Sequence, residues 1–516
     1  MEVPQVPPGP APVTRWRTLT RTGCEIAFFG ILSLAVVLFL NAYSKSDFLV
    51  PVAQAFAGVF AGGLLIALFG ALKHGWTARP DLRRPILFAV IIGVSIFAAH
   101  MYVINSPPTS QCSSSTKPGC VMDEVFYVPA AQDLIQGTQC APYADNCNME
   151  HPFLAKALIA SGIEIFGFND LGWRFFNAVL GSLSIPMLFA LVYMLSGNKR
   201  LSYFSSFLFM TDTMFFAHAS VALIDVPAIF FALFAFLVYF RKGRIWKIDN
   251  VTASGFLLGL ALLSKETAIF AVATLFTYEL LFAEGSFRQV AIGAAKLTLA
   301  AAVVFFIGLQ SYDTLFAAAK VPTFLQHLEF IFKYGGALIG GGWKDPVLGR
   351  YINPLDWLLY YTPVSYLVTT VTVTITGGTV VQTLSYIGVG FYGVNNVIVL
   401  WLVFVWVPIV IYRLLKKVPE GQKRSGDDRA MLVMLLWFAW SYLPYIALWQ
   451  YGRVTYPFYI LPAVPALATG AAYFVTRDWF PSKVAWFYLV AALGWFVWYF
   501  PLKDFLPTYI RAVLGH

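Results

Sequence analysis

Charged residues are scarce in this chain of 516 residues. Asp, Glu, Lys and Arg together make up 12% of it, whereas 59% is hydrophobic. Soluble globular proteins average about 25% charged and roughly 45–50% apolar residues. So few charges cannot cover the surface of a soluble body of this size, which excludes a cytosolic enzyme and a disordered protein. The composition therefore indicates an all-α polytopic membrane protein whose main solvent is lipid.

Acidic residues are the scarcer kind of charge, because 26 Asp and Glu stand against 35 Lys and Arg, a net charge of +9. In a soluble protein such an excess would suggest nucleic acid as a partner. In a membrane protein, basic residues gather in cytoplasmic loops and face anionic headgroups. We therefore expect membrane lipids, and no nucleic acid, as partners.

Near-uncharged runs of about 20 residues, the length that a transmembrane helix needs, recur along the chain. They lie at about 24–43, 49–72, 85–105, 175–195, 201–219, 221–240, 290–309, 392–412, 431–449, 455–475 and 484–501. The stretch 252–283 is long enough for two more helices, interrupted at Ser264-Lys265-Glu266. The sequence therefore predicts about thirteen transmembrane helices.

A secretory-signal pattern is absent from the N-terminus, which is Pro-rich and then basic. We therefore expect a cytoplasmic N-terminus, and the positive-inside rule then fits the loops. The predicted order is a cytoplasmic tail (1–23), two N-terminal spans (24–84), a larger transmembrane domain (85–501) and an extracytoplasmic tail (502–516). Two extracytoplasmic segments are long, at about 106–174 and 310–390. An internal repeat of the kind that transporters show is not seen.

Cysteine is rare, with five in the chain, and four of them fall in the first long extracytoplasmic segment: Cys112, Cys120, Cys140 and Cys147. An even set in such a segment indicates two disulfides. We favour the pairs Cys112–Cys120 and Cys140–Cys147, although four cysteines allow three arrangements. A zinc site is the alternative, but the spacings are wider than paired zinc ligands favour. Cys24, at the end of a span, is expected to be an inert apolar residue.

Two adjacent carboxylates, Asp123 and Glu124, open an amphipathic stretch that closes at Gly137. Acids are stabilised at a helix N-terminus by the helix dipole, so the pair could simply cap a surface helix. In a chain with so few charges, however, two carboxylates just outside a membrane span favour a catalytic role.

The motif HPFLAK, from His151 to Lys156, opens a second apolar helix in the same segment. Pro152 suits the first turn of a helix, and Lys156 follows it by about one turn. If this helix lies in the membrane interface, Lys156 points at headgroup level, where it would meet a phosphate. A lysine that merely snorkels to water is the alternative.

Further charges gather at the outer ends of spans. Asp225, after His218, begins the span 221–240, and an acid in a span is costly enough to suggest a function. Lys265 and Glu266 break the 252–283 hairpin on the same side, where they could also just neutralise each other. Arg174 and Arg453 stand at the outer ends of other spans.

The second long segment shows two patterns. Residues 312–334 predict an amphipathic interfacial helix with Phe324, Leu325, Leu328 and Phe332 on one side. In 371–383, apolar and Thr residues alternate on each side of Gly377-Gly378, which predicts a small β-hairpin with a Gly-Gly turn.

These motifs together resemble the protein O-mannosyltransferase family of GT-C membrane glycosyltransferases. The Asp-Glu pair, HPxxxK and Arg174 carry the resemblance, which continues through Leu223–Pro227, Gly259–Lys265, and Arg453 with Tyr456–Pro462. It covers roughly 85–500, a core of about eleven spans that follows the two N-terminal ones. The chain departs from the family in having Phe153 where HPP is usual, and it lacks room for the β-trefoil domain that eukaryotic members insert.

The resemblance implies transfer of mannose from a polyprenyl or dolichyl phosphate to Ser or Thr hydroxyls of translocated proteins. Asp123, with Glu124 beside it, would form the catalytic pair, Asp123 being the base of a one-step inverting displacement. Lys156, Arg453 and Arg174 would bind the donor phosphate. The residues expected to position the substrate are His151, Asp225, Lys265 and Tyr456.

No metal or other cofactor is obligatory on this interpretation, although His151 with Glu150, or His218, could bind a divalent ion. The expected location is the plasma membrane, or the endoplasmic reticulum membrane in a eukaryote, with the site on the extracytoplasmic side. An oligomer is left open. Three alternatives remain: an aminoarabinose-transferase-like enzyme that glycosylates a lipid, a flippase for the lipid-linked sugar, and a structural membrane scaffold.

Overall fold

The computed structural model describes residues 83–105, 121–137, 147–241, 244–245, 248–317, 321, 323–340, 349–359, 364–377, 380–416 and 425–500, with scattered residues between 18 and 73. The chain divides into two compact parts, Met1–Ile91 and Ile92–His516. The second part contains every element discussed below except the start of α3. The predicted spans 24–43 and 49–72 and the two predicted tails lie largely outside the described residues.

Helices dominate the described chain, and hydrophobic side chains lie exposed on many of them, as lipid contact requires. Among the described residues, six helical stretches are long and apolar enough to cross a membrane: Arg83–Val103, Asp170–Ser196, Phe287–Ala317, Val397–Leu415, Gly426–Gln450 and Pro457–Val475. Shorter apolar helices are Asp225–Phe240, Asn250–Ser264 and Ser482–Trp498. The protein is therefore a multi-pass integral membrane protein.

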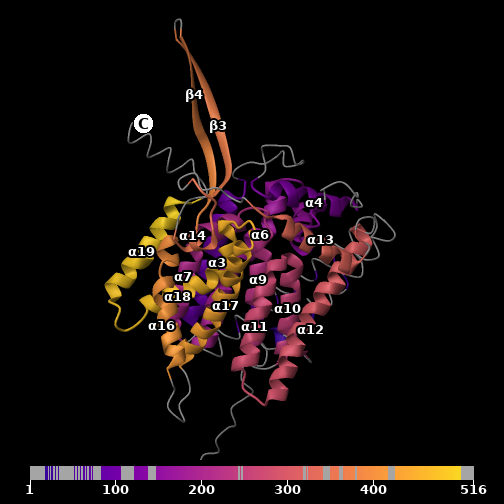
Figure 1. The fold of residues 1–516 in the computed structure, drawn as a ribbon, viewed down its shortest axis with the longest axis vertical. Helices are drawn as coiled ribbons and strands as arrows, with labels where there is room; N and C mark the ends of the chain where they lie inside the picture. Colours follow the sequence, from indigo (N-terminus) through magenta and orange to yellow (C-terminus); the bar gives the residue numbers. More distant parts are fainter. Residues whose placement is uncertain are drawn as a thin grey trace, which may run out of the picture. The chain divides into compact units, whose positions relative to one another are not determined.

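The central helices pack through small residues. α10 (Asn250–Ser264) lies against α9 (Asp225–Phe240) and α12 (Phe287–Tyr312), and α6 (Asp170–Ser196) contacts α9 and α7 (Lys199–Met210) (Figure 1). A Cβ placed on Gly255 would lie 2.5 Å from the Leu297 carbonyl oxygen. Only a glycine therefore lets α10 approach α12 this closely, which is the usual way in which membrane helices associate.

Two of the predicted spans have a different form. The predicted span 201–219 is wrong as one helix, because α7 ends at Met210 and α8 (Thr213–Ala219) begins anew. The cause is Asp212, whose carboxylate accepts the Phe215 N–H at 2.8 Å and caps α8. The predicted break in 252–283 is confirmed, since a short 3₁₀ turn, η3 (Glu266–Ala268), separates α10 from α11 (Ile269–Phe282).

At the other end of the sequence, α16 (Val403–Leu415) follows the short α15 (Val397–Leu400). α17 (Gly426–Gln450) comes next, and the 3₁₀ segment η5 (Pro457–Ala463) then leads into α18 (Val464–Val475). The last described helix is α19 (Ser482–Trp498). α18 packs against α7 and α17, which joins this half of the helical layer to the first half.

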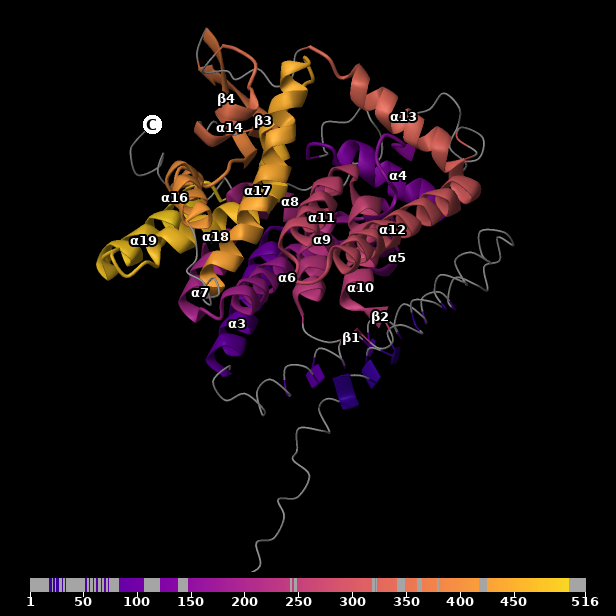
Figure 2. The same ribbon diagram turned by 60° about the horizontal axis from the view of Figure 1, so that its bottom comes forward.

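The elements of the two long segments lie at one end of the helical layer. In Figures 1 and 2, α4 (Glu124–Gln136), α13 (Phe324–Ala337), α14 (Pro354–Leu359) and the hairpin of β3 (Val364–Gly377) and β4 (Val380–Gly393) share that end. The short strands β1 (Arg244–Ile245) and β2 (Ile248–Asp249) lie at the opposite end (Figure 2). The sequence prediction that the two long segments share a membrane face agrees with this arrangement.

The hairpin is confirmed but is longer than the predicted 371–383. Its antiparallel register runs from Val364↔Gly393 to Gly377↔Val380. The predicted helix 312–334 is also modified. α12 continues to Tyr312, a π-helical turn follows at Asp313–Ala317, and α13 is a separate helix. α13 is amphipathic as expected, since Leu325 and Phe332 are exposed whereas His327 and Ile331 are buried.

Candidate active site

Asp123 lies at the N-terminal end of α4, in the N-cap position, but its side chain does not cap the helix. Its carboxylate makes no hydrogen bond to any residue that the structure describes. Burial raises the pKa of Asp123; Lys265, His151 and His218 oppose that rise, and Asp225 adds to it. A carboxylate whose pKa is raised is a stronger base than one at its ordinary pKa. These neighbours also show that four sequence-predicted charges converge on Asp123.

Glu124, the next residue, has the opposite environment. It is fully buried, and its two oxygens accept from Arg174 Nε at 2.8 Å and Arg174 Nη2 at 2.9 Å. They also accept the backbone N–H groups of Val121 at 3.1 Å and Ala222 at 2.9 Å. Arg174 donates in addition to the Ile104 carbonyl at 2.8 Å. The ion pair between Glu124 and Arg174 joins α4 to α6, and the bond from Ala222 joins α4 to the segment before α9. Together these bonds hold the neighbouring Asp123 in place.

Lys156 is also fully buried, in α5 (Leu154–Phe166), so its ammonium lies inside the protein, and its position at headgroup level stays a prediction. Its ammonium donates to the backbone carbonyls of Cys147 at 3.2 Å, Asn148 at 2.5 Å and His151 at 2.9 Å. Three acceptors match the three protons of an ammonium. Lys156 therefore holds the 147–151 loop against α5, because that loop, and not solvent, lies at the end of its side chain.

A chain of buried polar groups, formed by Lys265, Asp225 and His218, lies within electrostatic reach of Asp123. Lys265 Nζ lies 2.6 Å from Asp225 Oδ1, and His218 Nδ1 lies 3.4 Å from Asp225 Oδ2. His218 Nε2 lies 2.7 Å from the Tyr366 hydroxyl of β3. Lys265 thus pairs with Asp225, and not with its neighbour Glu266, which lies 3.0 Å from His151 Nδ1. The cross-pairing ties the HPF loop and the start of α9 to the turn between α10 and α11.

Arg453 differs from Lys156 and Lys265 in having a buried nitrogen without a partner in the described part of the chain. Its Nη1 is buried and has no hydrogen-bond partner among the residues that the structure describes. A Cβ placed on Gly335 of α13 would lie 3.6 Å from this nitrogen, so the guanidinium lies close against that helix. Burial raises the pKa of Tyr456, Asp123 adds to the rise and Arg453 opposes it. Tyr456 therefore lies within electrostatic reach of both groups.

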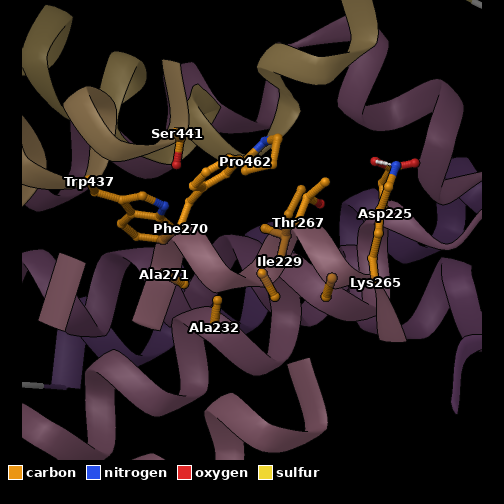
Figure 3. Close-up of a pocket in the computed structure, with 12 residues that line it drawn as sticks. Asp225, Ile229, Ala232, Lys265, Thr267, Phe270, Ala271, Trp437, Ser441 and Pro462 are labelled. Carbon is orange, nitrogen blue, oxygen red and sulfur yellow. Dashed lines mark hydrogen bonds and ion pairs between the residues drawn. The ribbon is translucent and has the colours of Figure 1, made fainter. Parts of the chain in front are cut away.

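An apolar pocket begins at the Asp225–Lys265 pair (Figure 3). Its wall comes from α9, η3, α11, α17 and η5, with Asp225 and Lys265 at one end and Trp437 at the other. Ile229, Phe270 and Pro462 line its length. The pocket is thus charged at one end and apolar along its length.

The groups considered for a divalent ion already have partners. His151 contacts Glu266, and Glu150 accepts from the Asn148 amide at 2.7 Å. Cys147 is disulfide-bonded, but Cys112, Cys120 and Cys140 lie outside the described residues, so the predicted pairing stays a prediction. Sequence reasoning missed Tyr366, which lies in no motif that would have singled it out, and it did not foresee that Glu266 contacts His151.

Comparison with known proteins places this geometry in context. Residues 158–310 match the family model of dolichyl-phosphate-mannose–protein mannosyltransferases. The resemblance to protein O-mannosyltransferases is confirmed. A polyprenol-phosphate-mannose–protein mannosyltransferase of Corynebacterium glutamicum is 29% identical over 199 residues, which cover 37% of this chain and 33% of that protein. Its counterpart in Mycobacterium tuberculosis is 31% identical over 116 residues, 22% of each chain. The matched part thus spans a third or less of these curated relatives.

The solved structures extend the likeness of the fold beyond that part. The S. cerevisiae protein O-mannosyltransferase complex bound to the sugar donor superposes with a TM-score of 0.60 at 14% sequence identity. The superposition covers 80% of this chain and 89% of the yeast chain. At this identity the likeness shows the fold, and the predicted GT-C fold of a helical membrane protein is confirmed. The number of membrane crossings stays a prediction.

Proposed function

We propose that the protein transfers mannose from a polyprenyl or dolichyl phosphate to Ser or Thr hydroxyls of translocated proteins, on the extracytoplasmic face of its membrane. The observation that carries the proposal is that the Asp123 carboxylate and Arg453 Nη1 have no hydrogen-bond partner among the described residues, while both act electrostatically on Tyr456. Asp123 also lies within electrostatic reach of Asp225 and Lys265, which line the apolar pocket. The names of the matched family and of the bacterial relatives support the same donor and acceptor.

In this mechanism the acceptor oxygen attacks the anomeric carbon of the sugar while the bond from that carbon to the phosphate oxygen breaks. Asp123 takes the hydroxyl proton, and the lipid phosphate leaves with the bonding electrons. One displacement inverts the anomeric centre. Since the leaving phosphate is a stable anion, it needs charge stabilisation more than protonation.

Arg453 is assigned to that stabilisation, because a guanidinium binds phosphate through two parallel N–H groups and Nη1 of this one has no hydrogen-bond partner among the described residues. Lys265, near Tyr459 and paired with Asp225, is placed at the entrance of the pocket, where the phosphate of a bound lipid would lie. Tyr456 and His151 are assigned to sugar positioning. Glu124, Arg174 and Lys156 are assigned to holding the site, since their hydrogen-bonding groups are engaged within the protein.

The orientation belongs to the same proposal. A cytoplasmic N-terminus would put α4, α13 and the hairpin on the extracytoplasmic side, where lipid-linked mannose and translocated proteins meet. No obligatory metal ion is proposed, because clustered cations can stabilise a phosphate monoester leaving group. Activity should therefore persist in EDTA.

The test is a transfer assay on the purified full-length protein, with polyprenyl-phosphate mannose and a Ser/Thr-rich peptide. We expect mannosylated peptide with an inverted anomeric centre. Mannose on a glycolipid without modified peptide would favour the lipid-directed transferase. Movement of the donor between leaflets without any transfer would favour the flippase. Either of these results would overturn the proposal.

A further inference from the structure

Tyr366 at the base of the β3–β4 hairpin makes two contacts that the proposed reaction does not explain. The register of the hairpin pairs Ser365 with Tyr392 and Leu367 with Phe391, so Tyr366 is an extra residue in β3. Such a bulge turns a side chain out of the regular pattern and leaves a backbone group unpaired, and bulges are frequent next to active sites. In this hairpin both the backbone carbonyl and the phenol of Tyr366 contact residues of the site.

The freed carbonyl of Tyr366 accepts the backbone N–H of Met122 at 3.2 Å. Met122 directly precedes Asp123 and has φ 52°, in the left-handed region that residues other than glycine seldom adopt. A conformation of this kind persists only when the surrounding structure holds it. The hydrogen bond from β3 is one such restraint, and it acts on the residue next to the proposed base.

The phenol of Tyr366 reaches the site by a second route. Its hydroxyl lies 2.7 Å from His218 Nε2, and the opposite nitrogen of that ring lies 3.4 Å from Asp225. The phenol is buried, and its pKa is raised well above the ordinary value by that burial, with Asp225 and Asp123 adding to the rise. It therefore stays protonated at any working pH and can donate to the imidazole.

Gly393 of β4 makes this arrangement sterically possible. A Cβ placed there would lie 2.4 Å from the Tyr366 hydroxyl oxygen and 2.5 Å from the ring carbon that bears it. Both distances are too short for any real contact, and the ring also packs edge-on against His218, with 5.4 Å between the ring centroids. Only glycine at 393 allows the phenol to occupy its place.

We propose that Tyr366 is a positioning residue, which couples the base of the hairpin to the catalytic turn by holding Met122 through its carbonyl and His218 through its phenol. The proposal rests on the proposed function, because it takes Asp123 as the base. It assigns a role to a residue outside the family motifs, in the one segment where a β-hairpin stands in place of a larger insertion.

Two substitutions test the coupling. Tyr366→Phe removes the hydroxyl but keeps the ring and the carbonyl, and should lower kcat about tenfold, the effect of one buried hydrogen bond. Gly393→Ala should displace the whole side chain and lower kcat about a hundredfold, as a misplacement of about 1 Å does. The matched control is Tyr442→Phe, which removes an equally buried phenol that donates to the Pro354 carbonyl at 2.9 Å, and should leave kcat within about twofold.

A purely structural role is separated by two further measurements. Binding of the product polyprenyl phosphate, one per protein at unchanged Kd, would show that the variants are folded. The pH profile of kcat/KM then reports Asp123, which faces Lys265, His151, Asp225 and His218. A loosened turn admits water, so the pKa of Asp123 falls and the acid limb moves to lower pH. An unmoved acid limb in Gly393→Ala would overturn the proposal, as would a wild-type kcat in both folded variants.

The last step asks whether Gly393→Ala acts through Tyr366. In a Tyr366→Ala background the clash is gone, so adding Gly393→Ala should lower kcat no further, whereas a second, independent loss would contradict the coupling. If the wild-type protein transfers no mannose, the proposed function fails by itself. Hydrogen exchange of residues 121–127 then still decides the coupling: faster exchange in Gly393→Ala than in wild type and Tyr442→Phe supports it, and equal exchange overturns it.

Discussion

Two groups of charged residues at the same end of the helical layer differ in one respect. The held cluster comprises Glu124, Arg174 and Lys156, which are buried and hydrogen-bonded within the protein. The open cluster comprises Asp123, Arg453 and Tyr456, and here a carboxylate and a guanidinium nitrogen have no partner among the residues described by the structure. Unpaired polar groups beside buried paired ones are costly, so their persistence points to a ligand that completes them.

The division cuts between neighbours in the sequence. Asp123 and Glu124 share a motif and a helix N-terminus, yet only Glu124 is bonded to Arg174 and to the Ala222 amide. The carboxylate that is best bonded is thus the less suited to take a proton, because its lone pairs are already engaged. A motif alone therefore does not tell which of its residues is structural and which is catalytic. The predictions below test whether the hydrogen bonds of each residue tell them apart.

The largest effect is expected from Asp123→Asn. Loss of the general base should lower kcat about 10²–10⁴-fold, and the melting temperature should not fall, because no hydrogen bond of the protein is lost. Transfer kinetics and thermal melting in detergent measure the two quantities. Asp478→Asn, at an exposed residue, is the control and should behave as wild type. If Asp123→Asn kept more than a tenth of the activity, Asp123 would not be the general base.

Glu124→Gln should lower the stability of the protein and leave the chemistry of the folded molecules largely intact, the reverse of Asp123→Asn. It leaves the buried Arg174 guanidinium with only the more distant Asp170, 3.7 Å away, as counter-charge, and breaking a buried pair costs about 3–5 kcal/mol of unfolding free energy. The remaining folded molecules should bind polyprenyl phosphate as wild type does. Glu329→Gln, in an exposed pair with Lys333, should leave the melting temperature nearly unchanged. Normal stability with lost activity would instead restore Glu124 to the catalytic pair.

Arg453→Ala tests the other open charge. Removing a group that stabilises the leaving phosphate should lower kcat by about 10²-fold, at the lower end of what one such donor contributes. Arg453→Lys keeps the charge without the two parallel donors, and should fall between wild type and Arg453→Ala. Arg288→Ala, at an exposed arginine, is the control. A loss of stability without a loss of kcat would place Arg453 in the held cluster.

The features that could be predicted from sequence are those set by interactions between residues close together in the chain. Helical spans and the break at Lys265 depend on local hydrophobicity, so both could be predicted. The strand alternation at 371–383 was equally local. The predicted span 201–219 is divided at Asp212, whose carboxylate accepts the Phe215 N–H and caps a new helix. Average hydropathy does not take account of such a cap.

The residues of the site could be listed from sequence, but their roles could not. Lys156 follows Pro152 by one turn, yet its environment depends on how the 147–151 loop folds back over α5. Lys265 has Glu266 beside it, but pairs with Asp225, which is 40 residues away. Tyr366 depends on a bulge and on a glycine in the opposite strand. Each role arises from tertiary contacts that spacing along the chain does not encode.

The smallest effect is expected from Lys156→Met, which tests one of the two members of the held cluster that sequence assigned to the phosphate. The variant leaves the carbonyls of Cys147, Asn148 and His151 without their donor, at a cost of about 1–3 kcal/mol. Donor affinity should be unchanged. Lys333→Met, at an exposed lysine, is the control, and a lost donor affinity in a stable Lys156→Met would move Lys156 to the open cluster.

The pH dependence of the same variant gives a finer measure. Burial lowers the pKa of Lys156 to about 7 in the folded protein, below the ordinary 10.5 of the unfolded chain. Between these two values the unfolded chain binds more protons, so the unfolding free energy contributed by this group rises with pH. From pH 7 to 9 the melting temperature of wild type should therefore gain on that of Lys156→Met, whereas below pH 6 the two should run parallel. A constant difference across the range would mean that the carbonyls hold the ammonium charged despite its burial.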